Sequence, residues 1–262
     1  MRHLLILNPN TTASVTALLQ QHGQRAAGAD VLVSTATARF GAPYIACEAS
    51  YAVAGHAVLD AWAHALMATP RSFQSRPHPS AVLIGCFGDP GLWALRDSSD
   101  VPVTGLAEAA FTAAAALGPF AVVTGGARWR PMLERLAGAL GLSAQLAGIH
   151  TVAPSGAQLA ADPDAAVALL AEACREAAAR WPVNSIVLGG AGLAGMAARV
   201  QARLQADVQA DVGVPVIDSV EAGVRHALAL PVQSDKASGF VCGWQGVSVD
   251  MTAMGATAPG RP

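Results

Sequence analysis

Three short segments of this chain recur in the same order, and each is an apolar run that ends in a turn. The recurring pairs are VLIGCFGDPG (82–91) with IVLGGAGLAG (186–195), VPVTGLAEAAFTAA (101–114) with VPVIDSVEAGVRHA (214–227) and, more loosely, LLILNPN (4–10) with FAVVTGG (120–126). Apolar runs bounded by glycine are typical of buried strands. The pairs are either coincidental pieces of a generic α/β chain or the mark of two similar lobes that share a cleft.

Strand-like segments alternate with helical segments along the chain. The expected strands are HLLIL, DVLVSTA, AVLIG, FAVVT, SIVLG and VPVI, and the expected helices include 11–26, with Thr11 or Thr12 near its N-cap, and 50–67. Asp89 and Pro90 have the residue types of an N-cap and a first helical position. With the repeat, this alternation predicts an α/β fold of two pseudo-symmetric lobes with parallel sheets and a cleft between them. We place lobe 1 at 1–105 plus 215–262 and lobe 2 at 106–214.

Composition narrows the class of protein. The chain has 262 residues, of which 53% are hydrophobic and 13% charged, so it can bury a large core. A formal net charge of −2 and the lack of a charge block argue against a nucleic-acid partner. The apolar run near the N-terminus, Leu4–Leu7, is too short for a signal peptide. The uncharged stretch 109–127 is interrupted by Gly118 and Pro119, which argues against a membrane span.

Four cysteines, at positions 47, 86, 174 and 242, form no CxxC pair. Their spacing therefore indicates neither a zinc site nor a redox pair, and it favours a reduced, cytoplasmic setting. Cys86 directly follows an expected strand and precedes an expected helix. Backbone N–H groups and a helix dipole at such a point favour a thiolate, which acts as a nucleophile or a base. A buried, inert cysteine at a strand end is the alternative.

Several motifs together resemble the hydantoin and allantoin racemases of the aspartate/glutamate racemase superfamily. They are LNPNTT (7–12), GCFGDPGL (85–92), VVT (122–124), VLGGAGLAG (187–195) and VPVIDSVEAGV (214–224). The resemblance implies two pseudo-symmetric lobes, no cofactor, no metal and proton transfer at a carbon next to a carbonyl. In that family two cysteines flank the substrate, one from each lobe. The first corresponds to Cys86, and the second corresponds to Gly190, which has no side chain.

Gly190 leaves the mechanism open. Inversion needs an acid/base group on each face of a planar intermediate, so one thiol alone predicts proton exchange without inversion. Cys47, Cys174 and Cys242 are the other thiols that could supply the second group. Three alternatives to a two-base racemase are therefore open. The protein is a one-thiol decarboxylase of arylmalonate type, or it is a catalytically silent ligand-binding relative, or Gly190 was introduced to disable turnover.

The substrate contacts follow from the same turns. Asn8 and Asn10 either bind a substrate carbonyl or ring N–H or form an Asx turn and helix cap, and the resemblance favours Asn10. Backbone N–H groups of the two glycine-rich turns can stabilise an enolate. The expected substrate-binding residues are Asn10, Gly85, Phe87, Gly88, Thr124, Gly125, Ala191 and Gly192. The segment FGAP, 40–43, is expected to cover the pocket.

Two other groups have plainer explanations. His56, Asp60 and His64 recur every four residues on an expected helix, as solvated residues do far more often than metal ligands. Glu108 and Glu221 lie near helix starts, where the dipole favours carboxylates.

From the resemblance and the position of Cys86 we expect an isomerase, a racemase of hydantoin type, with Cys86 as its acid/base. Its expected partners are a small-molecule substrate and further copies of itself in a homo-oligomer, with no nucleic acid or membrane.

Overall fold

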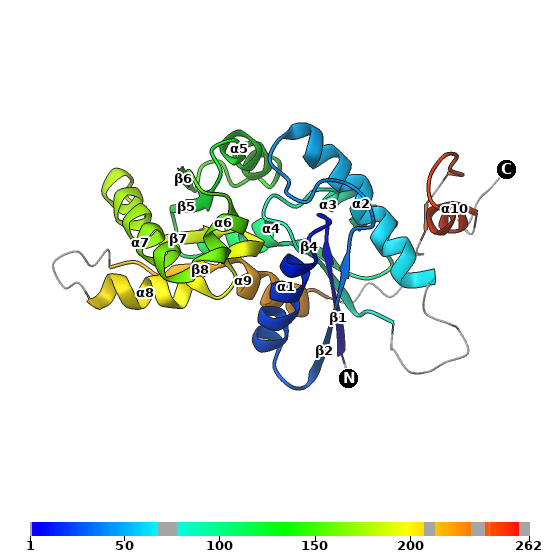
Figure 1. The fold of residues 1–262 in the computed structure, drawn as a ribbon, viewed down its shortest axis with the longest axis horizontal. Coiled ribbons are helices and arrows are strands. Elements are labelled where there is room, and N and C mark those ends of the chain that lie inside the picture. The colour runs from blue at the N-terminus through cyan, green and yellow to red at the C-terminus, as the bar shows by residue number, and fades with distance from the viewer. Residues whose placement is uncertain (1, 68–77, 207–212, 232–238, 241, 257–262) are drawn as a thin grey trace.

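A computed structural model of the chain describes residues 2–67, 78–206, 213–231, 239–240 and 242–256. Within these residues the strands form two parallel sheets (Figure 1). The first has the order β2-β1-β3-β4 and the second the order β6-β5-β7-β8. The predicted α/β fold with parallel sheets is therefore confirmed.

The first sheet is built from the N-terminal repeat. Its strands and helices are β1 (Arg2–Asn8), α1 (Ala13–Ala27), β2 (Val31–Thr37), α2 (Glu48–Met67), β3 (Ala81–Ile84), α3 (Leu92–Ser98) and β4 (Val103–Gly105). All four residues of β3 are buried, and so are all residues of β1 except Arg2. Continuous burial of this kind is expected where helices cover both faces of a parallel sheet. Thr12 is the N-cap residue of α1, as predicted.

The second sheet repeats this plan. Its elements are α4 (Leu106–Ala115), β5 (Phe120–Gly125), α5 (Trp129–Ala139), β6 (Leu146–Val152), α6 (Gly156–Ala161), α7 (Pro163–Arg180), β7 (Ser185–Gly189), the 3₁₀ turn η1 (Ala191–Leu193), α8 (Met196–Ala206) and β8 (Val216–Asp218). Helices α9 (Ser219–Ala229) and α10 (Val249–Ala256) follow. Strand β5 pairs with β6 and β7, as β1 pairs with β2 and β3. Each recurring sequence pair thus occupies the same place in its own sheet.

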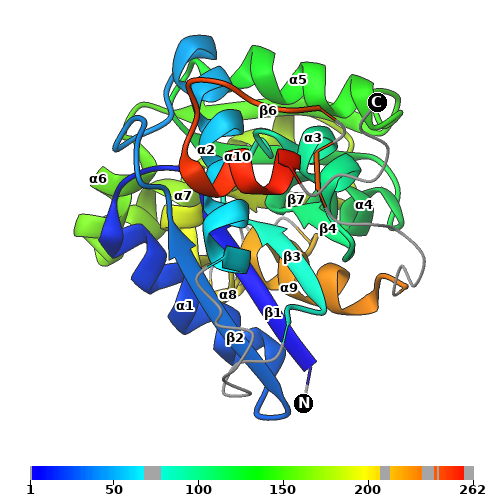
Figure 2. The ribbon, with the colours of Figure 1, turned by 90° about the vertical axis from the view of Figure 1, so that its right-hand side faces the viewer.

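Two helices pack mainly against the sheet of the other repeat. Helix α4 follows β4 of the first sheet but packs mainly against β7 of the second, and α9 follows β8 of the second sheet but packs against β3 of the first and against α1 and α4. Strand β8 pairs with β7 in the second sheet, although our lobe boundary put residues 215–218 with the first lobe. Helix α10 lies on α2 at the far end of the first lobe, as Figures 1 and 2 show.

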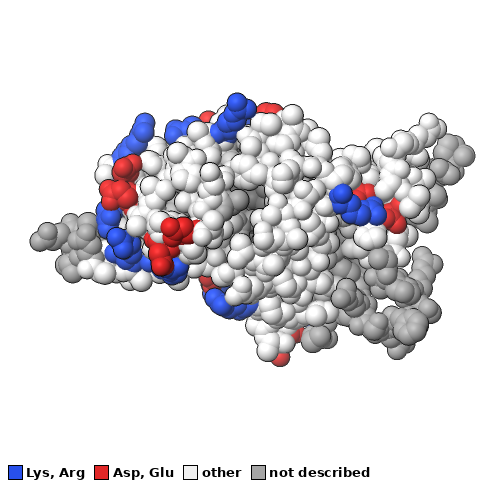
Figure 3. Space-filling model, viewed as in Figure 1, with Lys and Arg blue, Asp and Glu red and all other residues white. Residues whose placement is uncertain are grey.

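On the face shown in Figure 3, uncharged atoms surround a central hollow, and the Arg, Asp and Glu side chains lie mostly away from it. Glu48 of α2 and Arg135 of α5 form an ion pair between the two lobes. Among the described helices, none combines the length and the apolar character that a bilayer crossing needs.

Candidate active site

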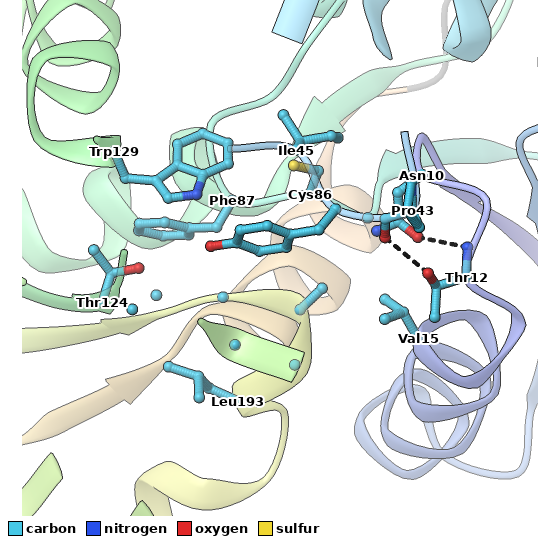
Figure 4. A pocket seen from close by; sticks show the side chains of 18 residues that line it. Asn10, Thr12, Val15, Pro43, Ile45, Cys86, Phe87, Thr124, Trp129 and Leu193 are labelled. Carbon is cyan, nitrogen blue, oxygen red and sulfur yellow. Dashed lines mark hydrogen bonds between the residues drawn. The ribbon is translucent and has the colours of Figure 1, made fainter. Parts of the chain in front are cut away.

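The junction of the two sheets holds a pocket with about 650 Å³ of space, open solvent at its mouth included. Residues from the carboxyl ends of β1, β3, β5 and β7 line it, together with the loop between β2 and α2 and the first residues of α1, α5, α6 and η1. They are Asn10, Thr12, Val15, Pro43, Tyr44, Ile45, Gly85, Cys86, Phe87, Thr124, Gly125, Trp129, Gly156, Gly189, Gly190, Ala191, Gly192 and Leu193. This is the edge at which parallel sheets bind ligands. Figure 4 shows Cys86 on one side of the hollow and Leu193 on the other.

Cys86 enters the pocket directly after β3 and is 7% exposed. Burial raises the pKa of its thiol, and the nearby Asp89 carboxylate raises it further. Our sequence analysis expected a helix start to favour the thiolate here. Helix α3 instead begins at Leu92, with Gly91 as its N-cap, so its N-terminus is not at Cys86. The helix start that was expected to favour a thiolate is therefore not at Cys86, and burial favours the protonated thiol.

Asp89 has a different role from the one its sequence predicts. It is fully buried and adopts a left-handed backbone with φ of 56°. Its carboxylate does not cap α3 but accepts hydrogen bonds from the backbone N–H groups of Ala107 (2.9 Å) and Glu108 (2.7 Å) in α4. Burial raises the pKa of Asp89 to about 7, while these amide donors act in the opposite direction. The turn that carries Cys86 is thereby fixed to the first turn of α4.

In the second repeat the turn after β7 is connected to the start of α9 in the same way, but the carboxylate belongs to the residue at the helix start. Asp218, at the start of α9, accepts hydrogen bonds from Gly195 N (2.7 Å), in the turn after β7, and from Val220 N (2.8 Å). Gly105 occupies the corresponding place in the first repeat, and a Cβ there would overlap the Asp89 carboxyl group. A carboxylate therefore connects the turn and the helix in both repeats. It belongs to the turn after β3 in the first repeat and to the start of α9 in the second.

Aromatic rings from each lobe pack on glycines of the other. The Phe87 ring occupies the space that a side chain at Gly189 would need, and the Trp129 ring does the same at Gly88. Phe87 lines the pocket as expected, whereas Gly88 does not, because Trp129 covers it. The structure thus brings together every expected substrate-binding residue except Gly88.

Two polar side chains of the pocket have hydrogen-bonding capacity to spare. Asn8 is fully buried: its Oδ1 accepts from Asn10 N (3.2 Å), which forms an Asx turn, and its Nδ2 donates to Asn10 Oδ1 (3.1 Å) and Thr16 Oγ1 (2.9 Å). Asn10 also accepts from Thr12 N (2.9 Å), but its Nδ2 donates to no described group. Thr124, at the end of β5, likewise has a hydroxyl without a partner among the described residues. A ligand can therefore use both.

Gly190 lies opposite, on the turn after β7. Its backbone has φ of 148° and ψ of 132°, a region that residues with a side chain rarely adopt. Its N–H donates to Ser219 Oγ (3.3 Å). The next residues, Ala191 and Gly192, open η1, so their amides lack a carbonyl partner within that turn. This turn offers backbone donors to a ligand and no acid/base side chain.

The other three cysteines do not line the pocket. Cys47 precedes α2 and is half-buried, and hydrogen bonds with Ser50 lower its pKa. Cys174 is buried in α7, where burial raises its pKa to about 12. Cys242 is exposed. None of these thiols takes the place left by Gly190.

The remaining candidate groups have structural partners. Asp60 is buried and pairs with Arg39 (2.7 Å), and His64 contacts Asp250 (3.0 Å). The described residues contain no cluster of three or more potential metal ligands. Glu108 pairs with Arg96 (2.6 Å). These groups stabilise the first lobe and lie outside the pocket.

Sequence reasoning missed the aromatic part of the pocket. FGAP was expected to cover it, but Pro43 lines it together with Tyr44 and Ile45, whereas Phe40 packs edge-on against His56. Trp129 was missed as well. Large side chains in the loop segment PYI, among small residues, were the available signal.

Comparisons with known proteins agree with this geometry. The profile of the Asp/Glu/hydantoin racemase family matches residues 4–227. A hydantoin racemase of Paenarthrobacter aurescens is 32% identical over 245 residues, which cover 90% of this chain and 95% of that protein. The structure of an allantoin racemase from Klebsiella pneumoniae superposes with a TM-score of 0.81 at 25% identity, over 96% of this chain and 99% of that one. An allantoin racemase from Pseudomonas fluorescens gives 0.76 at 28% identity, over 87% and 89%.

Proposed function

Because this chain belongs to the Asp/Glu/hydantoin racemase family, we propose that it racemises a small cyclic ureide of the hydantoin or allantoin type. The reaction moves the proton on the ring carbon next to a carbonyl and needs no cofactor. The observation that carries the proposal is the placement of Cys86, a thiol at the floor of a pocket formed by both sheets.

The pocket chemistry suits a neutral, planar ring. The described lining residues include no Asp, Glu, Lys, Arg or His, so a neutral ligand leaves no charge unpaired. Amide and hydroxyl groups of Asn10 and Thr124 can pair with ring N–H and carbonyl groups. Cys86 exchanges the proton, and the first amides of η1 donate to the oxygen that becomes negative in the enolate. Phe87, Trp129 and Ile45 supply the apolar contacts for a ring substituent.

Optical rotation tests this proposal. Single enantiomers of allantoin and of 5-methyl- and 5-benzylhydantoin are incubated with the wild-type protein, with Cys47→Ser and without enzyme. We expect the rotation of at least one ureide to decay toward zero faster with protein than without it. The Cys47→Ser variant is expected to behave like wild type, because Cys47 lies outside the pocket. No acceleration with any of these ureides would contradict the proposal.

Gly190 favours a second candidate, a decarboxylase that uses Cys86 alone. Loss of CO₂ from a disubstituted malonate leaves an enediolate, and one thiol can protonate one face of it. Release of CO₂ from arylmethylmalonates, without any change in ureide rotation, would favour this function. If ligands bind with equal affinity to wild type and Cys86→Ala and neither reaction occurs, the protein is a silent relative.

A further inference from the structure

The pocket contains a second ionisable side chain that the family motifs do not mark. Among its described lining residues, Cys86 and Tyr44 are the two whose side chains can lose a proton. Tyr44 belongs to the loop between β2 and α2. That loop is held at the pocket by hydrogen bonds from Thr12 Oγ1 to Pro43 O (2.7 Å) and from Thr11 N to Ala42 O (3.2 Å). Figure 4 shows the first of these bonds. The backbone beside Tyr44 is therefore fixed.

The Tyr44 hydroxyl lies against the second lobe, although its backbone belongs to the first. A Cβ on Gly126, which follows β5, would be 2.9 Å from this hydroxyl oxygen. The Trp129 indole at the start of α5 lies beside it as well. Cys86 follows β3 of the first sheet. Both residues therefore belong to the first lobe, but the Tyr44 side chain ends against the second.

The hydroxyl is buried, and no described residue forms a hydrogen bond of ordinary geometry with it, although the Trp129 indole N–H lies close enough to lower its pKa. Such a group costs free energy unless a ligand completes its bonding. Tyr51 provides the contrast, because its hydroxyl donates to Gly88 O at 2.8 Å. Tyr44 is therefore arranged to interact with a ligand, whereas Tyr51 supports the fold.

The turn after β7 of the second lobe lacks an acid/base side chain. Gly190 stands where the family motif has its second cysteine, and the three remaining thiols are elsewhere. A ligand between the lobes would have Cys86 on one face and no thiol on the other. The ionisable side chain that lines the pocket and contacts the second lobe, at Gly126, is that of Tyr44.

We propose that Tyr44 is the second proton-transfer residue of this enzyme and acts on the substrate face opposite Cys86. The inference rests on the proposed ureide racemase function. In one direction, the Cys86 thiolate takes the proton from the ring carbon, and the C–H electron pair moves into the adjacent carbonyl as an enolate. The Tyr44 hydroxyl then gives its proton to the opposite face of that carbon, where the enolate pair re-forms a C–H bond. The phenolate that results regains its proton, and the thiol loses one, by exchange with solvent or by the reverse reaction.

The pKa shifts of the two groups are consistent with one acting as the base and the other as the acid. Burial raises the pKa of Tyr44, the Trp129 indole N–H beside the hydroxyl lowers it, and a Cys86 thiolate nearby raises it. Burial raises the pKa of Cys86 as well. Because a negative charge on either group disfavours ionisation of the other, one of the two holds its proton while the other is ionised, which is the pairing of one base with one acid that inversion requires.

Proton NMR in D₂O with each enantiomer of 5-benzylhydantoin tests the proposal. Exchange of the ring-carbon proton and inversion are followed together in wild type, Tyr44→Phe and Tyr51→Phe, against an enzyme-free control. We expect wild type to invert both enantiomers. Tyr44→Phe should lose inversion about 100-fold or more. It should still exchange the proton of the enantiomer whose C–H faces Cys86, within about tenfold of wild type. Because no described residue forms a hydrogen bond of ordinary geometry with the hydroxyl, the variant's melting temperature should stay within about 2 °C of wild type.

Any one of three results would overturn the assignment of Tyr44 without contradicting proton transfer by Cys86. Tyr44→Phe could invert at the wild-type rate, it could lose exchange and inversion by the same factor, or wild type could exchange without inverting. The second of these would make the hydroxyl an enolate donor. Tyr51→Phe is the matched control, in which any loss should affect exchange and inversion equally. A wild-type protein that neither exchanges nor inverts any ureide would instead remove the racemase function itself, and the assignment of Tyr44 with it.

Discussion

Replacing Asp89 with alanine should loosen the turn that carries Cys86. The substitution removes the acceptor for two amides of α4, at 2.9 Å and 2.7 Å, in a fully buried position. Loss of a helix cap costs about 1–2 kcal/mol. Alanine in the left-handed conformation of residue 89, with φ of 56°, adds about 1 kcal/mol. We therefore expect a loss of about 2–3 kcal/mol in the free energy of unfolding, or roughly 5–10 °C in melting temperature.

The pH dependence of this loss follows from the same burial. Burial raises the pKa of Asp89 from its ordinary value of 3.8 to about 7, so the native state holds a proton that the unfolded state releases between those pH values. Asp89 therefore makes wild type less stable as the pH rises through this window, and the alanine variant lacks the effect. The deficit of Asp89→Ala should be about 2–3 kcal/mol at pH 5 and smaller by at least about 1 kcal/mol at pH 8.

Urea unfolding at pH 5 and pH 8, followed by tryptophan fluorescence, measures both quantities. Asp162→Ala is the matched control, because Asp162 caps the exposed start of α7 through a single bond to Ala165 N (3.1 Å). Its loss should be below about 1 kcal/mol. An Asp89→Ala deficit no larger than the control would refute the role of Asp89 as the α4 cap. A deficit that grows with pH would show that the amides outweigh burial and would refute the raised pKa.

Three further predictions concern the site. Gly105→Ala should cost about 2 kcal/mol or more by thermal melting, because its Cβ overlaps the Asp89 carboxyl group, and an added Asp89→Gly change should recover part of the loss. Gly190→Cys should cost about 1–3 kcal/mol, because φ is 148° and the new Cβ lies 3.2 Å from Leu193 Cγ. A variant as stable as wild type would mean that this backbone relaxes freely. Finally, kcat/KM for racemisation, corrected for the enzyme-free rate, should rise from pH 7 to pH 9.5, because the raised pKa of Cys86 keeps the thiolate scarce at neutral pH. A flat profile would contradict a thiolate base.

The sequence pattern was most informative where tertiary structure agrees with local rules. Strands β1, β3, β5 and β7 lie inside the sheets and are buried on both faces, so each is an uninterrupted apolar run. Edge strand β6 was missed, because most of its residues are only half-buried and it carries polar residues such as His150 and Thr151. The repeat placed Cys86 and Gly190 at matching turns, and both line the pocket.

Local rules failed where a side chain bonds to a distant element. Asp89–Pro90 has the pattern of a helix start, but the Asp89 carboxylate bonds to α4, whose first turn lies 18 residues along the chain. The Tyr44 hydroxyl reaches the second lobe from a loop of the first, and no spacing rule relates it to Gly126. The thiolate expected at Cys86 also failed, because burial depends on packing that the local sequence does not encode.

The central claim is that Cys86 transfers the proton of the ring carbon. Exchange of that proton in D₂O, measured for wild type, Cys86→Ser and Cys242→Ser with the same ureide, tests it most directly. Cys242 is exposed, so its replacement should leave exchange unchanged. The account predicts that Cys86→Ser falls at least about 100-fold, toward the enzyme-free rate, while its melting temperature stays close to that of wild type. A folded Cys86→Ser protein that exchanges the proton at the wild-type rate would contradict the account.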